Sequence, residues 1–176
     1  MRLSLAAVAL PLAAAYSAHP MLLKAVEQQG CALPSNYTIR DFVGQTNGTN
    51  ADADASSPTY IAFAYADAAT QVQTRCQFNA TSKSTTPEGL TPRFACENRD
   101  VKFIWQPGQL TMVERACPNP QGTPLYEASG SVTIQAPCKA GRCVANATEY
   151  TGRFASLSPV RDPTSFKMAY QMMEIE

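Results

Sequence analysis

The sequence predicts an all-β fold, a single disulfide-bonded antiparallel β-barrel or sandwich, and three observations support this prediction. Apolar and polar side chains alternate with a period of two, most clearly in Gln71–Phe78, which is typical of half-buried strands. Thirteen prolines and nine glycines fall largely between such runs, where turns are expected. Six cysteines, an even number, follow an export signal, which indicates disulfide bonds.

Residues 1–18 are predicted to be a signal peptide. Arg2 precedes an apolar run that ends in small residues, and Pro11 interrupts this run before it reaches the ~20 residues that cross a bilayer. Cleavage is expected between residues 15 and 18. We therefore expect a secreted, extracellular protein without a membrane anchor. Residues 19–30 are expected to form an arm or short helix, and residues 31–176 a single β domain.

The strands are expected in order along this domain. Apolar residues alternate with polar or small ones, and turn-forming segments such as Thr86–Gly89 and Pro118–Gly122 separate the runs. Seven to nine short strands at this spacing favour a sandwich or barrel. The expected strands are Tyr37–Phe42, Ile61–Tyr65, Gln71–Phe78, Pro92–Glu97, Val101–Trp105, Leu110–Cys117, Tyr126–Gln135, Cys143–Tyr150 and Phe166–Glu176.

The six cysteines favour one disulfide pair and leave the other two open. Cys76 and Cys96 lie in expected strands joined by a polar segment, and neighbouring strands would bring their Cβ atoms within bridging distance. No Cys-x-x-Cys motif is present, so neither a zinc site nor a thioredoxin-like redox pair is expected. The remaining cysteines can pair as Cys31–Cys117 with Cys138–Cys143, or as Cys117–Cys138 with Cys31–Cys143.

Four Asn-x-Ser/Thr sequons agree with export through the secretory pathway. Each is an acceptor only where it is exposed, and we expect about two of the four to carry glycans. The candidates are Asn36, Asn47, Asn79 and Asn146.

Charge and histidine content exclude several functional classes. The 14 basic and 14 acidic side chains cancel, which argues against a nucleic-acid partner. The chain has one histidine, His19, near the expected mature amino terminus. A copper monooxygenase needs a second histidine, and a Ser-His-Asp or Cys-His hydrolase needs an imidazole within the β domain. No metal or cofactor is therefore expected.

Few residues remain as candidates for catalysis or ligand contact. Glu114 and Glu127 lie in expected strands and could face one cleft as a two-carboxylate glycosidase, although a solvated sheet face or an ion pair with Arg115 is the favoured interpretation. The alternating aromatic residues, Trp105 among them, could stack on a carbohydrate or another ligand, but packing in the core is the favoured interpretation. Trp105, beside a turn at a strand end, is the first choice for a ligand-contact residue. The aromatic residues assigned to the core are Tyr60, Phe63, Tyr65 and Phe103.

A set of short motifs, in order with the cysteines, gives the chain a resemblance to a known family. The motifs extend from Cys31 to about Cys138, and the chain over this range resembles the small secreted fungal proteins whose domain is named after the major allergen of Alternaria moulds. The motifs are Cys31–Phe42, Ile61–Asp67, Val72–Cys76, Val101–Trp105, Leu110–Cys117 and Ala128–Ser131.

The resemblance implies a compact disulfide-bonded β-barrel, no established enzymatic activity, and a role as an allergen or effector that contacts plant defence proteins. The pair Cys138 and Cys143 and the segment after Tyr150 depart from the family pattern. The family's dimer uses an additional cysteine, so the even count here favours internal pairing and a monomer.

These observations together predict a secreted, non-catalytic binding protein. Its partner is expected to be a host apoplastic protein or a small ligand. The alternative from a different class is a secreted carbohydrate-active protein, either a wall-binding module or a two-carboxylate hydrolase.

Overall fold

The computed structural model describes residues 23–24, 26–27, 30–46, 58–106 and 108–160. The expected signal peptide, His19, the sequon at Asn47 and the expected closing strand Phe166–Glu176 lie outside the described residues. Within the amino-terminal arm, Leu23, Lys24, Val26 and Glu27 are helical, and the Val26 side chain is buried against the core. No helix among the described residues has the length and apolar character to cross a membrane.

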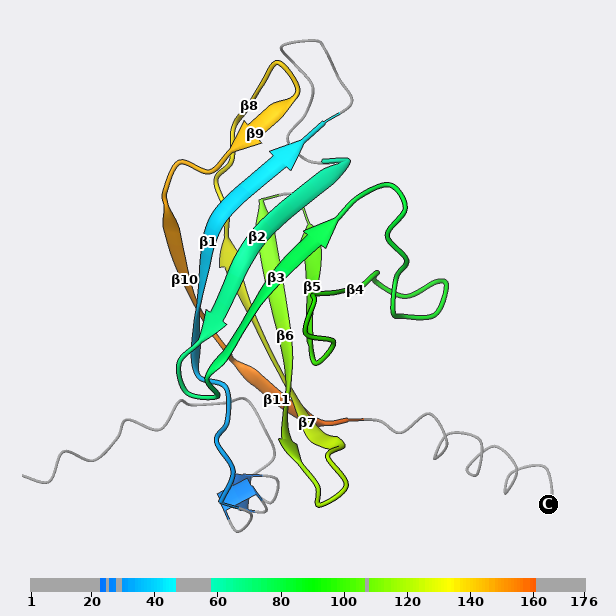
Figure 1. Ribbon diagram of the computed structural model, residues 1–176, viewed down its shortest axis with the longest axis vertical. Helices are drawn as coiled ribbons and strands as arrows, with labels where there is room; N and C mark the ends of the chain where they lie inside the picture. The colour runs from blue at the N-terminus through cyan, green and yellow to red at the C-terminus, as the bar shows by residue number, and fades with distance from the viewer. Residues whose placement is uncertain (1–22, 25, 28–29, 47–57, 107, 161–176) are drawn as a thin grey trace, which may run out of the picture.

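The fold is a sandwich of two antiparallel sheets, the second of the two architectures that the sequence predicts (Figure 1). The first sheet has the order β3-β2-β1-β9-β8, and β10 also pairs with β1. Its strands are β1 (Asn36–Gln45), β2 (Tyr60–Asp67), β3 (Val72–Phe78), β8 (Cys138–Lys139), β9 (Arg142–Val144) and β10 (Glu149–Arg153). The second sheet has the order β11-β7-β6-β5-β4. Its strands are β4 (Phe94–Ala95), β5 (Val101–Gln106), β6 (Gln109–Pro118), β7 (Pro124–Thr133) and β11 (Ser156–Pro159).

The core lies between the two sheets and follows from the period-two alternation. Ile61, Phe63 and Tyr65 of β2 point inward and are at most 3% exposed. Phe63 meets Phe103 of β5 edge to face, with ring centroids 5.1 Å apart. Full burial of one such side chain contributes about 1.5–3 kcal/mol, so these rings are a main source of cohesion between the sheets.

One tyrosine ties the two sheets together at the end of β1 next to β10. Tyr37 is fully buried, and its hydroxyl donates a 2.8 Å hydrogen bond to the carbonyl oxygen of Gly130 in β7. Its ring covers Gly152, the residue opposite it in β10. A Cβ atom at Gly152 would lie 2.1 Å from Tyr37 Cζ, so only glycine fits there.

The prediction of one continuous strand over Cys143–Tyr150 is wrong, because the structure has two strands there, β9 and β10. Both strands pair with β1, on either side of a register shift between Arg40 and Val43. The intervening residues leave the ladder, and the Asn146 backbone N–H donates to the carbonyl oxygen of Gln135 instead. The strand Ser156–Pro159 was also not expected. It forms after Phe154, where the chain passes from the first sheet to the second.

Three disulfides reinforce the sandwich. Cys76–Cys96 connects β3 of the first sheet to the residue after β4, and it is the pair that the sequence favours. Cys31–Cys117 connects the segment before β1 to β6. Cys138–Cys143 closes the hairpin of β8 and β9. The structure therefore has the first of the two arrangements left open by the sequence, and two of the bridges attach a segment outside the strands to a strand of a sheet.

Candidate functional site

The outer face of the first sheet carries a row of alanines along β2. Since the bulky residues of β2 point inward, Ala62, Ala64 and Ala66 point outward. The neighbouring strands place longer side chains on the same face: Ala64 lies between Arg40 of β1 and Arg75 of β3. Short side chains flanked by long ones leave a hollow, which we call the alanine trough.

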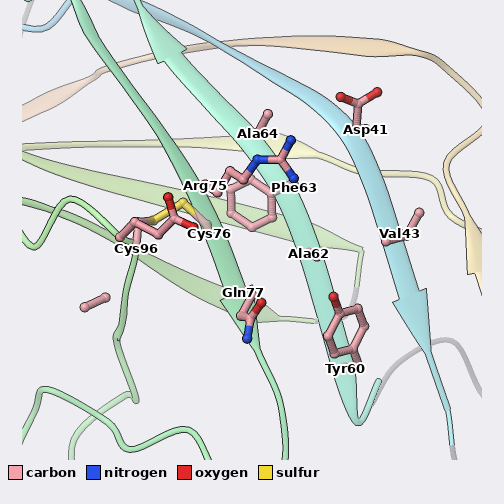
Figure 2. A pocket seen from close by; sticks show the side chains of 12 residues that line it. Asp41, Val43, Tyr60, Ala62, Phe63, Ala64, Arg75, Cys76, Gln77 and Cys96 are labelled. Carbon is pink, nitrogen blue, oxygen red and sulfur yellow. A yellow bond between two sulfur atoms is a disulfide. The ribbon is translucent and has the colours of Figure 1, made fainter.

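The alanine trough consists of two adjoining cavities that share Ala64, Arg75 and Glu97. Their volumes are about 640 and 350 Å³, and small-molecule sites commonly have about 300–1,000 Å³. Figure 2 shows the larger cavity, with the Arg75 side chain extending from β3 over β2 toward the side of β1 that carries Asp41. The trough is therefore an elongated site of ligand-binding size.

A β-bulge in β1 forms one wall of the trough. Arg40 pairs with Ala64 and Val43 with Ala62, so Asp41 and Phe42 together oppose the single residue Phe63. Asp41 has φ 53°, a left-handed conformation that aspartate tolerates better than most residues. As a result, Phe42 is buried in the core while the Asp41 carboxylate remains exposed on the wall.

The opposite wall is held in place by covalent and backbone contacts. The Glu97 backbone N–H donates a 2.9 Å hydrogen bond to the Arg75 carbonyl oxygen, and the Asn98 N–H donates to Thr74 Oγ1. The disulfide Cys76–Cys96 lies directly beside these bonds. This wall is thus preorganised without any ligand.

Most polar side chains of the trough have unused hydrogen-bonding capacity. Arg40 forms an ion pair with Glu149 of β10. In contrast, five other polar side chains around the trough form no ion pair or side-chain hydrogen bond with any described residue. These are Asp41, Gln73, Arg75, Gln77 and Glu97. Charged and amide groups arranged in this way are available to a ligand.

Tyr60 lies on the outer face of the first sheet at the trough, whereas Trp105 faces the interior. The assignment of Tyr60 to the core is wrong: it pairs with Gln45, on the same outward side of β2 as the alanines, and lines the end of the trough. Trp105 faces the interior beside Leu110, and the centroids of the Trp105 and Phe42 rings are 5.3 Å apart. It is partly buried and does not line the alanine trough.

Glu114 and Glu127 do not face one cleft, so the two-carboxylate site is wrong for this pair. In the register of β6 with β7, Glu114 is opposite Ala128 and Arg115 is opposite Glu127. Adjacent positions in a strand point to opposite faces, so Glu114 lies in the core and Glu127 lies on the outer face. Glu127 forms ion pairs with Arg93 and Arg115, and the pair with Arg115 was expected. For Glu114 the expected solvated face or ion pair is wrong, because this residue is buried.

Glu114 is a buried carboxyl group in the core. Its side chain is 1% exposed, and the Tyr65 hydroxyl donates a hydrogen bond to Oε2. Burial raises the pKa of Glu114, and Tyr65 and the nearby Thr70 hydroxyl partly oppose this rise. Thr70 Oγ1 and Glu114 Oε1 nevertheless form no hydrogen bond of standard geometry. Burial and the neighbouring Glu114 also raise the pKa of Tyr65.

Three of the four sequons lie within the described residues. Asn36 is exposed at the start of β1. Asn79 Oδ1 accepts hydrogen bonds from the backbone N–H and the hydroxyl of Thr81, within its own sequon. Asn146 is exposed, and its Nδ2 donates to Gln135 Oε1. Use of these sites as glycan acceptors stays a prediction.

The described residues contain no group of three or more histidine, cysteine, aspartate or glutamate side chains suited to hold a metal ion. Comparison of the chain with protein-family models, curated proteins and solved structures gave no match. The alanine trough is therefore defined by its geometry alone. The sequence shows alanine at every second position of β2, between the inward residues Ile61, Phe63 and Tyr65, but this repeat identifies a hollow only once the strands are paired.

Proposed function

We propose that the protein is an extracellular, non-catalytic binding protein that takes a small ligand in the alanine trough. The observation that carries this proposal is the trough itself: a hollow of ligand-binding size whose walls bear unpaired polar groups. The resemblance to the fungal allergen family points in the same direction, since it implies an allergen- or effector-like protein that acts by binding.

Two further features support an extracellular role. The three disulfides are of the kind that persists in oxidising compartments outside the cytosol. The amino-terminal segment has the layout of a signal peptide. A non-catalytic role is supported by the separation of Glu114 and Glu127, the carboxylates that the sequence offered for hydrolysis, onto opposite faces of the second sheet.

The trough favours a small ligand over a whole host protein as the first partner. Its cavities are hollows of ligand-binding size on a sheet face, and charged or amide side chains of the flanking strands border the apolar floor along β2. A host apoplastic protein, the partner implied by the resemblance, could insert only an extended segment there.

The test fills the trough without disturbing the core. Ala64→Phe adds a large side chain to the outer face, where Ala64 borders both cavities. Ser131→Phe is the matched control, because Ser131 is exposed on the outer face of the second sheet. The immobilised mature proteins are incubated with low-mass extracts of plant extracellular fluid, and retained compounds are identified by mass spectrometry.

We expect wild type and Ser131→Phe to retain the same compounds and Ala64→Phe to lose them. Circular dichroism and thermal unfolding check that both variants fold. Equal retention of the compounds by Ala64→Phe and wild type would contradict the proposal that the trough is the binding site.

A further inference from the structure

Resting on the proposed function, we propose that the ligand of the alanine trough is a short neutral oligosaccharide, lying lengthwise on Ala62–Ala66 with its hydroxyls bound by the polar walls. The chemical class follows from three features of the trough: its shape, the kinds of polar group on its walls, and its charge.

The shape suits an elongated ligand. Four residue steps separate Ala62 from Ala66, which corresponds to about 13 Å along β2. The two cavities adjoin at Ala64 and Arg75, so one ligand can extend through both. The floor offers methyl groups, and Tyr60 lines one end. The C–H faces of pyranose rings can pack on both, since a tyrosine ring presents an apolar face and a polar tip.

The walls carry the kinds of group that bind hydroxyls. A sugar hydroxyl both donates and accepts, so it requires acceptors and donors within reach. The Asp41 and Glu97 carboxylates accept, the Arg75 guanidinium donates, and the Gln73 and Gln77 amides do both. All five are planar groups with two polar atoms side by side, which can bind two neighbouring hydroxyls at once. Because none has a side-chain partner among the described residues, binding would break no side-chain bond to that part of the chain.

The charge of the trough favours a neutral ligand. Arg75 is its unpaired cation, and the two carboxylates Asp41 and Glu97 face the same cavity. The Arg40 charge is already compensated by Glu149. The two carboxylates repel a polyanion, and Arg75 offsets part of their attraction for a polycation, whereas a polyhydroxylated chain can form hydrogen bonds with all three groups.

The experiment measures binding of defined sugars to the mature, enzymatically deglycosylated protein by isothermal titration calorimetry. The neutral probes are the hexasaccharides of chitin, laminarin and cellulose with their disaccharides, and a galacturonate hexamer is the acidic probe. Arg75→Met keeps an unbranched apolar stem but removes the guanidinium and its donors. Arg142→Met is the matched control, since Arg142 is exposed on β9 of the same sheet and outside the trough.

We expect at least one neutral hexasaccharide to bind wild type and Arg142→Met equally, and its disaccharide to bind more weakly. Arg75→Met should weaken binding at least tenfold, and Ala64→Phe should abolish it. Binding of the galacturonate hexamer alone would overturn the neutral class. If no sugar binds wild type, but Ala64→Phe fails to retain the extracellular-fluid compounds that wild type retains, the oligosaccharide proposal is overturned and the trough remains the proposed ligand site. If every ligand binds Ala64→Phe as well as it binds wild type, both proposals are overturned.

Discussion

The buried carboxyl group of Glu114 predicts a specific dependence of stability on pH, which Glu114→Gln should remove. Burial raises the pKa of Glu114, so the folded protein holds this proton more tightly than the unfolded chain does. Its contribution to stability is therefore complete below the pKa of the unfolded carboxyl, near 4.5, and is lost as the pH rises through the folded pKa. Glutamine keeps an oxygen that can accept the Tyr65 hydrogen bond, but it carries no charge at any pH.

The size of the effect follows from proton linkage. Where Glu114 is ionised in the unfolded chain and protonated in the folded protein, the free energy of unfolding falls by about 1.4 kcal/mol for each pH unit. Tyr65 does not contribute between pH 4 and 8, because burial and Glu114 raise its pKa further above its ordinary value of 10. The variant should thus match wild type near pH 4 and become progressively more stable than wild type as the pH rises.

Urea unfolding at pH values from 4 to 8, followed by tryptophan fluorescence, measures this difference. Trp105 is the only tryptophan and packs against Phe42, so its emission reports loss of the core. Glu127→Gln is the control. Its carboxylate is on the outer face and pairs with two arginines, so its replacement should not produce a gain in stability that grows with pH. A stability difference for Glu114→Gln that is constant with pH, or that falls with pH, would refute the reasoning.

Three further predictions concern stability and use the same urea assay. Gly152→Ala should cost about 3 kcal/mol or prevent folding, because its Cβ would overlap the Tyr37 ring; an unchanged midpoint would contradict this packing. Ala140→Gly should stabilise by about 1 kcal/mol, since Ala140 has φ 50° in the two-residue turn between β8 and β9; a lower midpoint would contradict that expectation. Replacing Cys31 and Cys117 with serine should cost about 4.5 kcal/mol, because their bridge spans a sequence separation of 86 residues; a loss below 1 kcal/mol would count against the chain-entropy argument.

The sequence predicted those parts of the fold that depend on local pattern. The alternation in Gln71–Phe78 is a property of consecutive residues, and β3 forms at Val72–Phe78. The pairing of Cys76 with Cys96 followed from strands close together in the chain, and the structure contains this bridge. Both features are determined within a short stretch of sequence, which is why they could be stated without knowledge of the whole fold.

Features that depend on strand register could not be predicted. A shift of one residue moves a side chain to the opposite face, and turns and packing over the whole sheet determine the register. The positions of Glu114 and Glu127 illustrate this, since only the pairing of Arg115 with Glu127 reveals that the two carboxylates diverge. The bulge at Asp41 also depends on pairing, because it is defined by two residues of β1 facing one residue of β2.

The alanine trough depends both on local sequence pattern and on strand register. The sequence alone therefore revealed only the part that depends on local pattern. The alternation in β2 was recognised by its apolar half, Ile61, Phe63 and Tyr65, because large buried residues determine which face points inward. Alanine fits either face of a sheet, so the other half of the pattern predicts nothing by itself. It becomes a site only when pairing places Arg40 and Arg75 on either side of Ala64. A search for small side chains between long ones must therefore compare residues across paired strands, and the binding experiments on Ala64→Phe test whether that cross-strand pattern has a function.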